Sequence, residues 1–585
     1  MSEIGRTGKD GRTAVDRRRF LAYFAASGLG GTLLPGALLA VAQDAPEIKA
    51  EMVAAAARIA GVPLTPEAEK AVAEGLNRRG GLVQNFQALR DMGLGNDTPS
   101  ALVFDPVLPG TKLPAGRSLL KTSKVKAAAP RTDEDLAFLP VTQLAALLKK
   151  RDIKSVDLTK LCLERLKKYD PVLHCVVSLT GDLALEQAER ADREIAAGKY
   201  RGVLQGVPWG AKDLLAVKGY KTTFGASPYK DQTIDRNATV FERLTEAGAV
   251  LVAKLTLGAL AMGDRWFGGQ TKSPWDPKSA DQGSSGSSAG PSAAVAAGLV
   301  PFAIGSETRG SIISPASRCG VTGLRPSFGR VSRYGAMTLS WTMDKLGPLC
   351  RAAEDCALVL HAIQGPDGRD NSVLDIPFAW DAGRDVRALR VGYIKSDTER
   401  EIPEDAKNPE RVRRMKEAQA FNKASLEVIR GLGVKPVPVE LPKLGSGPMD
   451  FLLTTEGAAA FDDLVRSEKL DLMSAEPERS AWVQSFRLHE LVPAVQYIQA
   501  NRARYRLMEA YQEFFKDMDV LIGSALGPTN LTGHPELALP HGFDSKGQPA
   551  ALRLTGRLFG DADVLLLAHA FQKRTDFHLK RPKLD

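Results

Sequence analysis

Apolar positions recur at helical spacing early in the chain, before a long stretch rich in Pro and Gly. Between residues 45 and 92, side chains such as Ile48 and Ile59 fall on the i, i+3, i+4 pattern that predicts helix. The Thr-Pro-Glu-Ala-Glu run at 65–69 has the composition of a helix start. From 96 to 131 the pattern breaks, and a connector is expected there.

From about residue 136 onward, amphipathic segments alternate with short apolar runs. Strands are predicted at 207–209, 249–253 and 300–304. Helices are predicted at 144–149, 157–169 (with Asp157 as its cap), 182–198, 238–247 and 292–298 (with Pro291 at its first position), and residues 399–515 are predicted to form a mostly helical lobe. This alternation predicts an α/β fold, with a mixed central sheet covered by helices on both faces.

The first 42 residues have the features of an export signal. Arginines at 17–19 are followed by Phe20, Leu21 and an uncharged stretch that ends in Ala-Val-Ala at Ala42. A basic start, an apolar middle and a small-residue exit are typical of a secretory signal, and paired arginines are typical of the twin-arginine type. We expect cleavage after Ala42, a periplasmic or otherwise exported product, and no stable membrane anchor after signal removal.

Composition excludes several classes of function. The formal net charge of +9 is spread over 585 residues without a basic stripe, so no nucleic-acid partner is expected. The five cysteines form no Cys-x-x-Cys pair, which argues against a disulfide framework or a structural metal site, although one oxidised pair stays open. Nothing in the sequence implies a cofactor or a metal.

A Ser- and Gly-rich run at 281–292 lies where a flexible linker would be unusual. It leads into an apolar helix, then a strand, and then the turn Gly-Ser-Glu-Thr-Arg-Gly-Ser that ends at Ser311. Glycines between buried elements allow backbone N–H groups to converge on a small charged atom, as an oxyanion hole requires. The pattern therefore predicts a catalytic loop.

These motifs resemble those of the amidase signature family. The family pattern has Gly-Ser-Ser and small residues, a Val-Ala-Ala-Gly-Leu helix and a Gly-Thr-Asp/Glu-Thr-Gly-Gly-Ser turn, which match residues 286–290, 295–299 and 305–311. A Pro-x-x-x-Lys-Asp motif matches 208–213, and the resemblance extends from about Leu136 to Phe571. Together with the N-terminal patterns, it predicts three parts: an export signal at 1–42, a helical extension and connector at 43–131, and an amidase-signature catalytic domain at 132–585.

The resemblance also implies a reaction, the hydrolysis of a small-molecule carboxamide to a carboxylic acid and ammonia or an amine. Lys212 would be the base, Ser287 the bridging residue and Ser311 the nucleophile that forms an acyl-enzyme. The backbone N–H groups expected to hold the oxyanion are those of Thr308, Arg309, Gly310 and Ser311, and the backbone of Met262 is expected to border the leaving-group pocket.

Physical chemistry agrees with this assignment. A serine hydroxyl needs a neighbour that removes its proton, and a lysine does this only when it is neutral. The residues just before Lys212 are apolar, which favours that state. Asp213 is expected to order its loop. Arg309 replaces a family glycine and either faces the pocket, favouring an acidic substrate, or turns to solvent. His534 and His541 are expected at the surface.

Three alternatives remain open at this stage. Residues 286–290 also fit Gly-x-Ser-x-Gly, with Ser288 as the nucleophile of a histidine-dependent hydrolase, although no strand is predicted before them. The amidase component (the A subunit) of a tRNA-dependent amidotransferase shares the family core and uses glutamine within a complex. The third alternative is a non-catalytic binding protein on the same fold. A homodimer is also left open.

Overall fold

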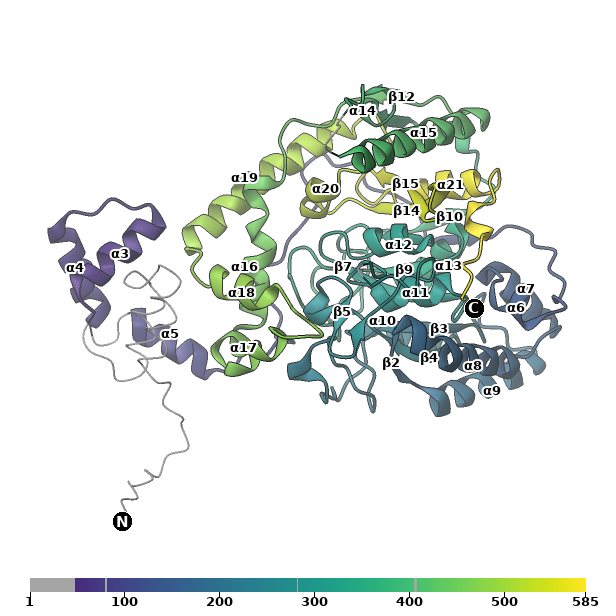
Figure 1. The fold of residues 1–585 in the computed structure, drawn as a ribbon, viewed down its shortest axis with the longest axis horizontal. Coiled ribbons are helices and arrows are strands. Elements are labelled where there is room, and N and C mark those ends of the chain that lie inside the picture. The colour runs from purple at the N-terminus through teal and green to yellow at the C-terminus, as the bar shows by residue number, and fades with distance from the viewer. Residues whose placement is uncertain (1–47, 79–81, 281, 405–407, 585) are drawn as a thin grey trace, which may run out of the picture. The chain divides into compact units, whose positions relative to one another are not determined.

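The computed structural model of the chain describes residues 48–78, 82–280, 282–404 and 408–584, so the predicted export signal and Asp281 lie outside the described residues (Figure 1). Its contacts divide the chain into two compact units. The first comprises Met1–Leu94 with Glu490–Gln496, and the second comprises Gly95–His489 with Tyr497–Asp585. The chemistry predicted from the sequence falls entirely within the second unit.

Within the region where helix was predicted, the described residues of the first unit form three helices. These are α3 (Ala50–Ala60), α4 (Pro66–Asn77) and α5 (Leu82–Asp91). Gly61 ends α3 with a φ of 67°, a conformation that glycine adopts at low cost. The predicted start of α4 is present, because the Thr65 side chain accepts a hydrogen bond from the N–H of Ala68 at 3.3 Å.

In its described residues, the second unit is built on an eleven-stranded mixed sheet. In spatial order its strands are β12 (Val437–Val439), β11 (Val391–Ile394), β13 (Val520–Ile522), β15 (Pro549–Gly556), β14 (Glu536–Phe543), β8 (Thr322–Arg325), β9 (Lys345–Cys350), β7 (Phe302–Glu307), β3 (Pro208–Lys212), β4 (Val250–Leu255) and β2 (Val176–Leu179). The neighbours β7, β3 and β4 run parallel to one another. Two small sheets lie outside it, formed by the pairs β1 (Leu119–Lys121) with β10 (Ala379–Asp381) and β5 (Arg265–Trp266) with β6 (Gly269–Gln270).

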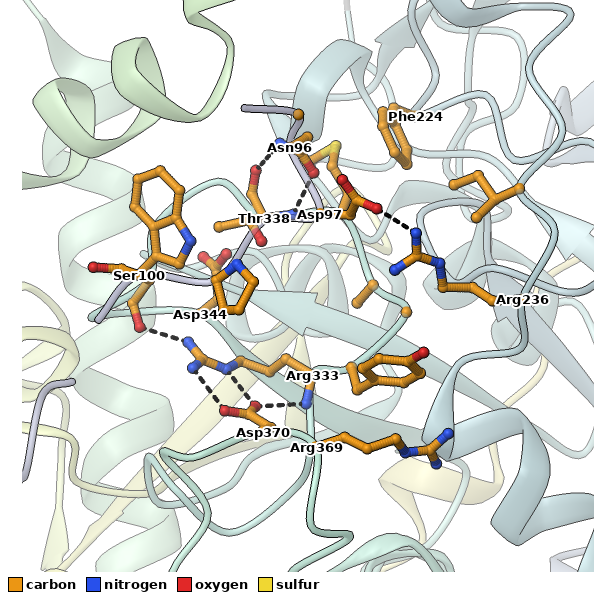
Figure 2. Close-up of a pocket in the computed structure, with 18 of the residues that line it drawn as sticks. Asn96, Asp97, Ser100, Phe224, Arg236, Arg333, Thr338, Asp344, Arg369 and Asp370 are labelled. Carbon is orange, nitrogen blue, oxygen red and sulfur yellow. Dashed lines mark hydrogen bonds and ion pairs between the residues drawn. The ribbon is translucent and has the colours of Figure 1, made fainter. Parts of the chain in front are cut away.

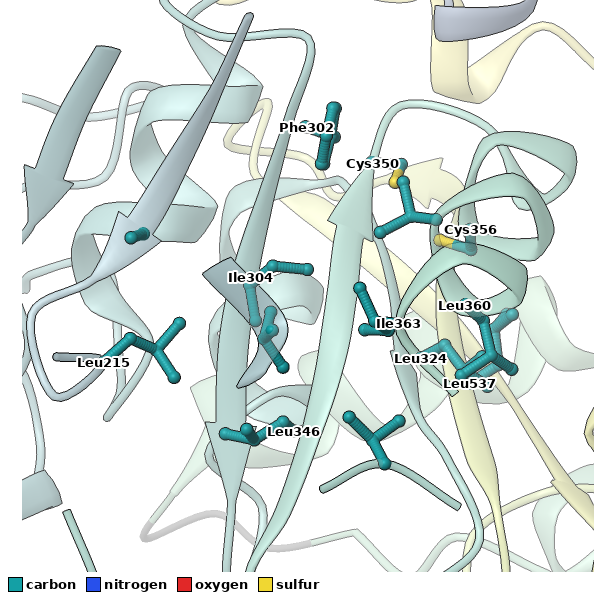
Figure 3. Close-up of a cluster of buried hydrophobic side chains, with 14 of the residues drawn as sticks. Leu215, Phe302, Ile304, Leu324, Leu346, Cys350, Cys356, Leu360, Ile363 and Leu537 are labelled. Carbon is teal, nitrogen blue, oxygen red and sulfur yellow. The ribbon is translucent and has the colours of Figure 1, made fainter. Parts of the chain in front are cut away.

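Side chains alternate between the two faces of this sheet, and helices cover both. On β7, Phe302 and Ile304 belong to one apolar cluster and Ala303 to another, as the two-residue period of a strand requires. Figure 3 shows the first cluster, in which Ile304 lies among residues of the neighbouring strands and of α13, including Leu360. The predicted α/β architecture is therefore confirmed.

The helices coincide with the predicted segments, but their starts and ends differ from the predicted ones by up to four residues. The prediction of Pro291 at the first position of its helix was wrong, because α11 begins at Ala289 and Pro291 is its third residue. The helices of the second unit are α6 (Asp133–Ala137), α7 (Val141–Lys150), α8 (Ser155–Leu173), α9 (Gly181–Ala196), α10 (Thr239–Glu246), α11 (Ala289–Ala296), α12 (Ile313–Cys319), α13 (Ala353–Ile363), α14 (Lys395–Glu399), α15 (Pro409–Gly431), α16 (Phe451–Ala460), α17 (Asp462–Arg466), α18 (Trp482–His489), α20 (Leu526–Thr532) and α21 (Asp561–Gln572), while α19 (Ala494–Phe514) begins in the first unit. The prediction of Asp157 as a cap was wrong. The helix α8 begins at Ser155, and Asp192 instead accepts hydrogen bonds from the N–H groups of Ser155 and Val156 at 2.7 and 3.0 Å.

The predicted helical segment at 399–515 is confirmed by α15 to α19. Among the described residues, no helix has both the length and the apolar character needed to cross a bilayer. The same residues contain no group of three or more His, Cys, Asp or Glu side chains arranged to hold a metal ion.

Candidate active site

Three parallel strands deliver the predicted site residues to one edge of the sheet. Lys212 is the last residue of β3, and the segment 308–311 follows directly after β7. The turn that contains Met262 follows β4, the other parallel neighbour of β3. Because the carboxyl ends of parallel strands meet at the same edge, residues far apart in the sequence converge there, which is where α/β sheets place their ligands.

Lys212 is fully buried and surrounded by hydroxyl groups. Its Nζ donates to the Oγ of Ser287 at 2.8 Å, of Ser306 at 2.8 Å and of Ser288 at 3.1 Å. Burial lowers the pKa of this lysine to about 7, although the negative charges of Asp344 and Glu307 act in the opposite direction. The side chain is therefore held close to the protonation state that a general base requires.

Ser287 and Ser311 are brought to the same place by a backbone contact. The Gly286–Ser287 peptide bond is cis, and the N–H of the next residue, Ser288, donates to the carbonyl oxygen of Ser311 at 3.0 Å. Ser287 is buried, whereas Ser311 is only partly buried and its hydroxyl makes no hydrogen bond to the described residues. The predicted nucleophile is thus partly exposed, and its backbone contacts the residue that follows Ser287.

Several backbone N–H groups of the predicted oxyanion loop have no hydrogen-bond acceptor among the described residues. The N–H groups of Thr308, Arg309, Gly310 and Ser311 donate to no acceptor in the described part of the chain. Gly310 has a φ of 88°, which lets the loop turn sharply between β7 and α12. Consecutive free amides at the start of a turn can converge on one developing negative charge.

Arg309 has the solvent-exposed orientation that was one of the two considered from the sequence, and it also has a carboxylate partner. It is exposed, and its guanidinium forms an ion pair with the carboxylate of Asp450 at 2.8 Å, just before α16. Through this ion pair, Arg309 links the loop to the helical segment at 399–515. Its backbone amide remains free for the site.

The Met262 turn borders the site through its backbone. A side chain at Gly286 would lie 1.8 Å from the carbonyl oxygen of Gly263, so the two segments are in direct contact. Leu260 and Ala261 have positive φ angles of 47° and 62°, which are costly for residues with a side chain. The turn is packed closely against Gly286, the residue before Ser287.

The structure also bears on the predictions made for Asp213 and for the two histidines, His534 and His541. Asp213 orders its surroundings as expected, because it accepts two hydrogen bonds from Thr223 and forms a buried ion pair with Lys254 at 2.7 Å. His534 and His541 were predicted at the surface and are buried instead, packed against aromatic rings that lie far away in the sequence.

Ser288 is not placed as an exposed nucleophile would be. It is fully buried, and its hydroxyl donates to the carbonyl oxygen of Ser306 at 3.1 Å. Residues 282–287 do not form a strand, so the strand–turn–helix context of a nucleophile elbow is absent in these described residues. The geometry does not support the histidine-dependent alternative.

A comparison with known families agrees with this geometry. The family model described as Amidase matches residues 157–528, which is more than half of the chain. The chain belongs to the amidase family. As a member of it, this amidase is an enzyme that acts on amide carbon–nitrogen bonds, with the amidase-signature fold.

Individual relatives fall into two groups. This amidase is 31% identical to the A subunit of the glutamyl-tRNA(Gln) amidotransferase from Methylococcus capsulatus, over 76% of its own chain and 98% of the relative. Among solved structures, it resembles the native peptide amidase of Stenotrophomonas maltophilia with a TM-score of 0.65 and 26% identity, covering 76% and 98% of the two chains. It also resembles a chain of an inhibitor-bound complex related to the origins of an s-triazine catabolic enzyme, with a TM-score of 0.65 and 25% identity, over 74% and 98% of the chains.

Glu307, at the end of β7, is part of a buried network of charged side chains that was not predicted from the sequence. Glu307 accepts hydrogen bonds from the N–H groups of Ile312 and Ile313 and pairs with Arg325 at 2.9 Å, both side chains being fully buried. Burial alone would raise the pKa of Glu307, but Arg325 and Lys345 hold it down to about 2. This carboxylate therefore fixes the first turn of α12, immediately after Ser311.

Replacing Glu307 by alanine is expected to lower the free energy of unfolding by about 3–5 kcal/mol, because Arg325 would be left buried without that partner. Denaturant unfolding of the amidase measures this change. The matched control is Asp576→Ala, which breaks the exposed pair with Lys580 and is expected to cost less than about 1 kcal/mol. Equal losses in the two variants would contradict the structural role of Glu307.

Asp344 is a second residue that sequence reasoning missed. It accepts a hydrogen bond from the Thr308 hydroxyl at 2.6 Å and from the N–H groups of Leu339 and Ser340 at 2.8 and 2.9 Å. Its negative charge raises the pKa of Lys212. It lies far from the quoted motifs in the sequence, so no local signal pointed to it.

Asp344→Asn is expected to shift the acidic limb of the kcat/KM pH profile toward lower pH, because the charge that favours protonated Lys212 is removed. The profile of the variant against the wild-type protein measures this shift. A loss of activity without any change in the limb would show that Asp344 acts only by holding Thr308. An upward shift would contradict the electrostatic argument.

Proposed function

We propose that this amidase hydrolyses a small-molecule carboxamide through an acyl-enzyme on Ser311. The observation that carries the proposal is the buried Lys212, with a pKa lowered to about 7 and its Nζ 2.8 Å from the Ser287 hydroxyl. A neutral lysine accepts a proton from Ser287, which in turn takes the proton of Ser311 as its Oγ attacks the amide carbon.

The rest of the reaction uses the neighbouring groups. The carbonyl oxygen becomes an oxyanion held by the free amides of Thr308, Arg309, Gly310 and Ser311. The proton returns through Ser287 to the leaving nitrogen, and the carbon–nitrogen bond breaks to release ammonia or an amine. Water then attacks the ester on Ser311 and gives a proton to the same relay, which returns it to the Ser311 oxygen as the ester bond breaks and the carboxylic acid leaves. Each oxyanion donor is worth roughly 100- to 1,000-fold in rate.

The test is ammonia release by the purified chain beginning at Gln43, across aliphatic, aryl, peptide and glutamine amides. Turnover of at least one amide, with acid and ammonia formed in equal amounts, supports the proposal. No turnover of any of them would overturn it in favour of a binding protein on the amidase fold.

A second candidate is glutamine-dependent amidotransfer, which the similarity to amidotransferase A subunits favours. That role requires partner subunits and tRNA. We expect glutaminase activity, if present, to be unchanged by added tRNA, and we expect no partner protein to co-purify with the chain. A stable complex with tRNA-dependent turnover would establish the second candidate instead.

We also propose that the chain is exported through its twin-arginine-type signal and works in the periplasm. The support is the sequence of residues 17–42. Fractionation of cells that express the full chain, followed by N-terminal sequencing, tests this: the expected product is periplasmic and begins at Gln43. An uncleaved cytoplasmic chain would contradict it.

A further inference from the structure

A cavity of about 540 Å³ lies beside the candidate active site and has the size of a small-molecule pocket. Asp344 accepts a hydrogen bond from the Thr308 hydroxyl, forms part of the cavity wall and is partly exposed to solvent. On another side lies Phe224, whose N–H donates to the carbonyl oxygen of Asp213, next to Lys212. Two residues of the cavity wall therefore contact residues of the site, whereas Lys212, Ser287 and Ser311 do not themselves line the cavity.

One wall comes from a segment that precedes the region matched by the family model. Residues between 95 and 103 line the cavity, whereas the model begins at residue 157. Asn96 anchors this segment by donating to the carbonyl oxygens of Thr338 and Ala460 at 2.8 and 3.1 Å and by accepting from the N–H of Thr338 at 3.0 Å. Figure 2 shows this contact together with the ion pair between Asp97 and Arg236.

The charges around the cavity leave an excess of negative charge. Its three arginines are all engaged with carboxylates: Arg236 with Asp97, Arg333 with Asp370, and Arg369 with Glu242 and Asp367. Among the lining carboxylates, Asp463 forms no ion pair in the described part of the chain, and Asp344 forms none within salt-bridge distance there, although the charges of Arg333 and Lys212 act on Asp344. Figure 2 shows Asp344 and the Arg333–Asp370 pair on the same side of the pocket.

Aromatic rings line the same space and suit a positive charge. Phe224, Tyr229, Tyr334 and Trp341 all contribute to the wall. The ring of Tyr334 already accepts the guanidinium of Arg369 at 4.3 Å from its centre. Ring faces attract cations, so these side chains add to the effect of the two unpaired carboxylates.

We propose that this cavity receives the acyl portion of the substrate and selects an acyl chain that carries a positively charged amine. This inference rests on the proposed amidase function and names its substrate class. The amide end of such a substrate points to Ser311, and its ammonium group lies among the aromatic rings near Asp463, which is at the exposed side of the cavity. The segment at 95–103 sets the reach of the pocket.

The decisive comparison uses two amides of equal length, ω-aminohexanamide and its methyl-terminated counterpart heptanamide. We expect the wild-type protein to prefer the amine by about tenfold in kcat/KM at low salt, the scale of one favourable charge contact. Asp463→Asn is expected to remove most of this preference. Asp462→Asn is the matched control, because the carboxylate of Asp462 pairs with Arg466 and does not line the cavity. The Asp462→Asn protein is expected to keep the preference for the amine.

Binding separates this inference from the proposed function. Titration calorimetry with the Ser311→Ala protein measures affinity for both amides without turnover, and the amine is again expected to bind about tenfold more tightly. Asn96→Ala is expected to weaken both amides to a similar extent, because it loosens the wall without changing the charge. Tight and selective binding without turnover in the wild-type protein would leave the pocket standing and refute the hydrolase. Turnover of neutral amides with no preference, or a preference that survives Asp463→Asn, would overturn the pocket alone.

Discussion

Replacing Ser311 by alanine is expected to lower kcat/KM on the best amide by roughly 10⁴- to 10⁶-fold, the range seen when a catalytic serine is removed. The reason is geometric: Ser311 is the partly exposed hydroxyl that follows the free amides of the loop, and its backbone is held to Ser288 at 3.0 Å. Ammonia release under saturating and subsaturating substrate measures the loss.

Two controls make this result specific. Ser314→Ala changes a hydroxyl three residues after Ser311, at the second residue of α12, where the Oγ of Ser314 would lie 3.1 Å from a side chain added at Gly310. This variant is expected to retain most of the activity. Thermal unfolding of both variants checks that the fold is intact. An active Ser311→Ala protein would place the nucleophile elsewhere, whereas trapping of the wild-type acyl-enzyme by hydroxylamine would locate the ester on Ser311.

The sequence was sufficient for the architecture where each element had a strong local pattern. Buried strands such as β4 and β7 are short apolar runs bounded by polar turns, and their two-sided burial follows from the mixed sheet. Helix boundaries were less accurate, since the start of α8 is decided by Asp192, a carboxylate from another helix. A single-sequence pattern contains no information on such a partner.

The candidate site shows the same division. Lys212, Ser287 and Ser311 were identified because they belong to contiguous motifs, and the strand topology brings those motifs together. Ser306 and Asp344 were missed, although the first lies inside a quoted motif. The hydrogen bond between Ser306 and Lys212, at 2.8 Å, depends on the parallel pairing of β3 with β7. The hydrogen bond between Asp344 and Thr308 depends on the position of the loop before β9.

The burial of histidines is a further example of long-range packing overriding local appearance. His534 and His541 flank a Pro-rich segment near the C-terminus, which suggested an exposed turn. His534 nevertheless stacks on Phe515, which follows α19, with ring centres 5.1 Å apart, and burial lowers its pKa to about 3. Neutral histidines in such a setting have a structural role, which is consistent with chemistry based on lysine.

The rate of hydrolysis is expected to rise with pH through about 7 and then reach a plateau, because Lys212 acts as a base only when neutral and burial lowers its pKa to about 7. Lys212→Ala is expected to lose at least about 10³-fold in kcat/KM and to lose this limb. The measurement is the pH dependence of kcat/KM for both proteins. A limb near pH 10 in the wild-type protein would show that Lys212 remains charged and cannot be the base.

The same group gives a stability test with a defined sign. The folded-state pKa lies near 7 and the ordinary value is 10.5, so the unfolded chain binds more protons than the native one between these values. The buried lysine therefore costs stability below pH 7, and this cost is relieved as the pH rises toward 10.5. Relative to Lys212→Met, which cannot titrate, the wild-type protein should gain stability across this range in denaturant unfolding. A difference between the two proteins that stays constant with pH would mean that the lysine keeps its ordinary pKa in the fold, and the proposed proton relay would then lack its base.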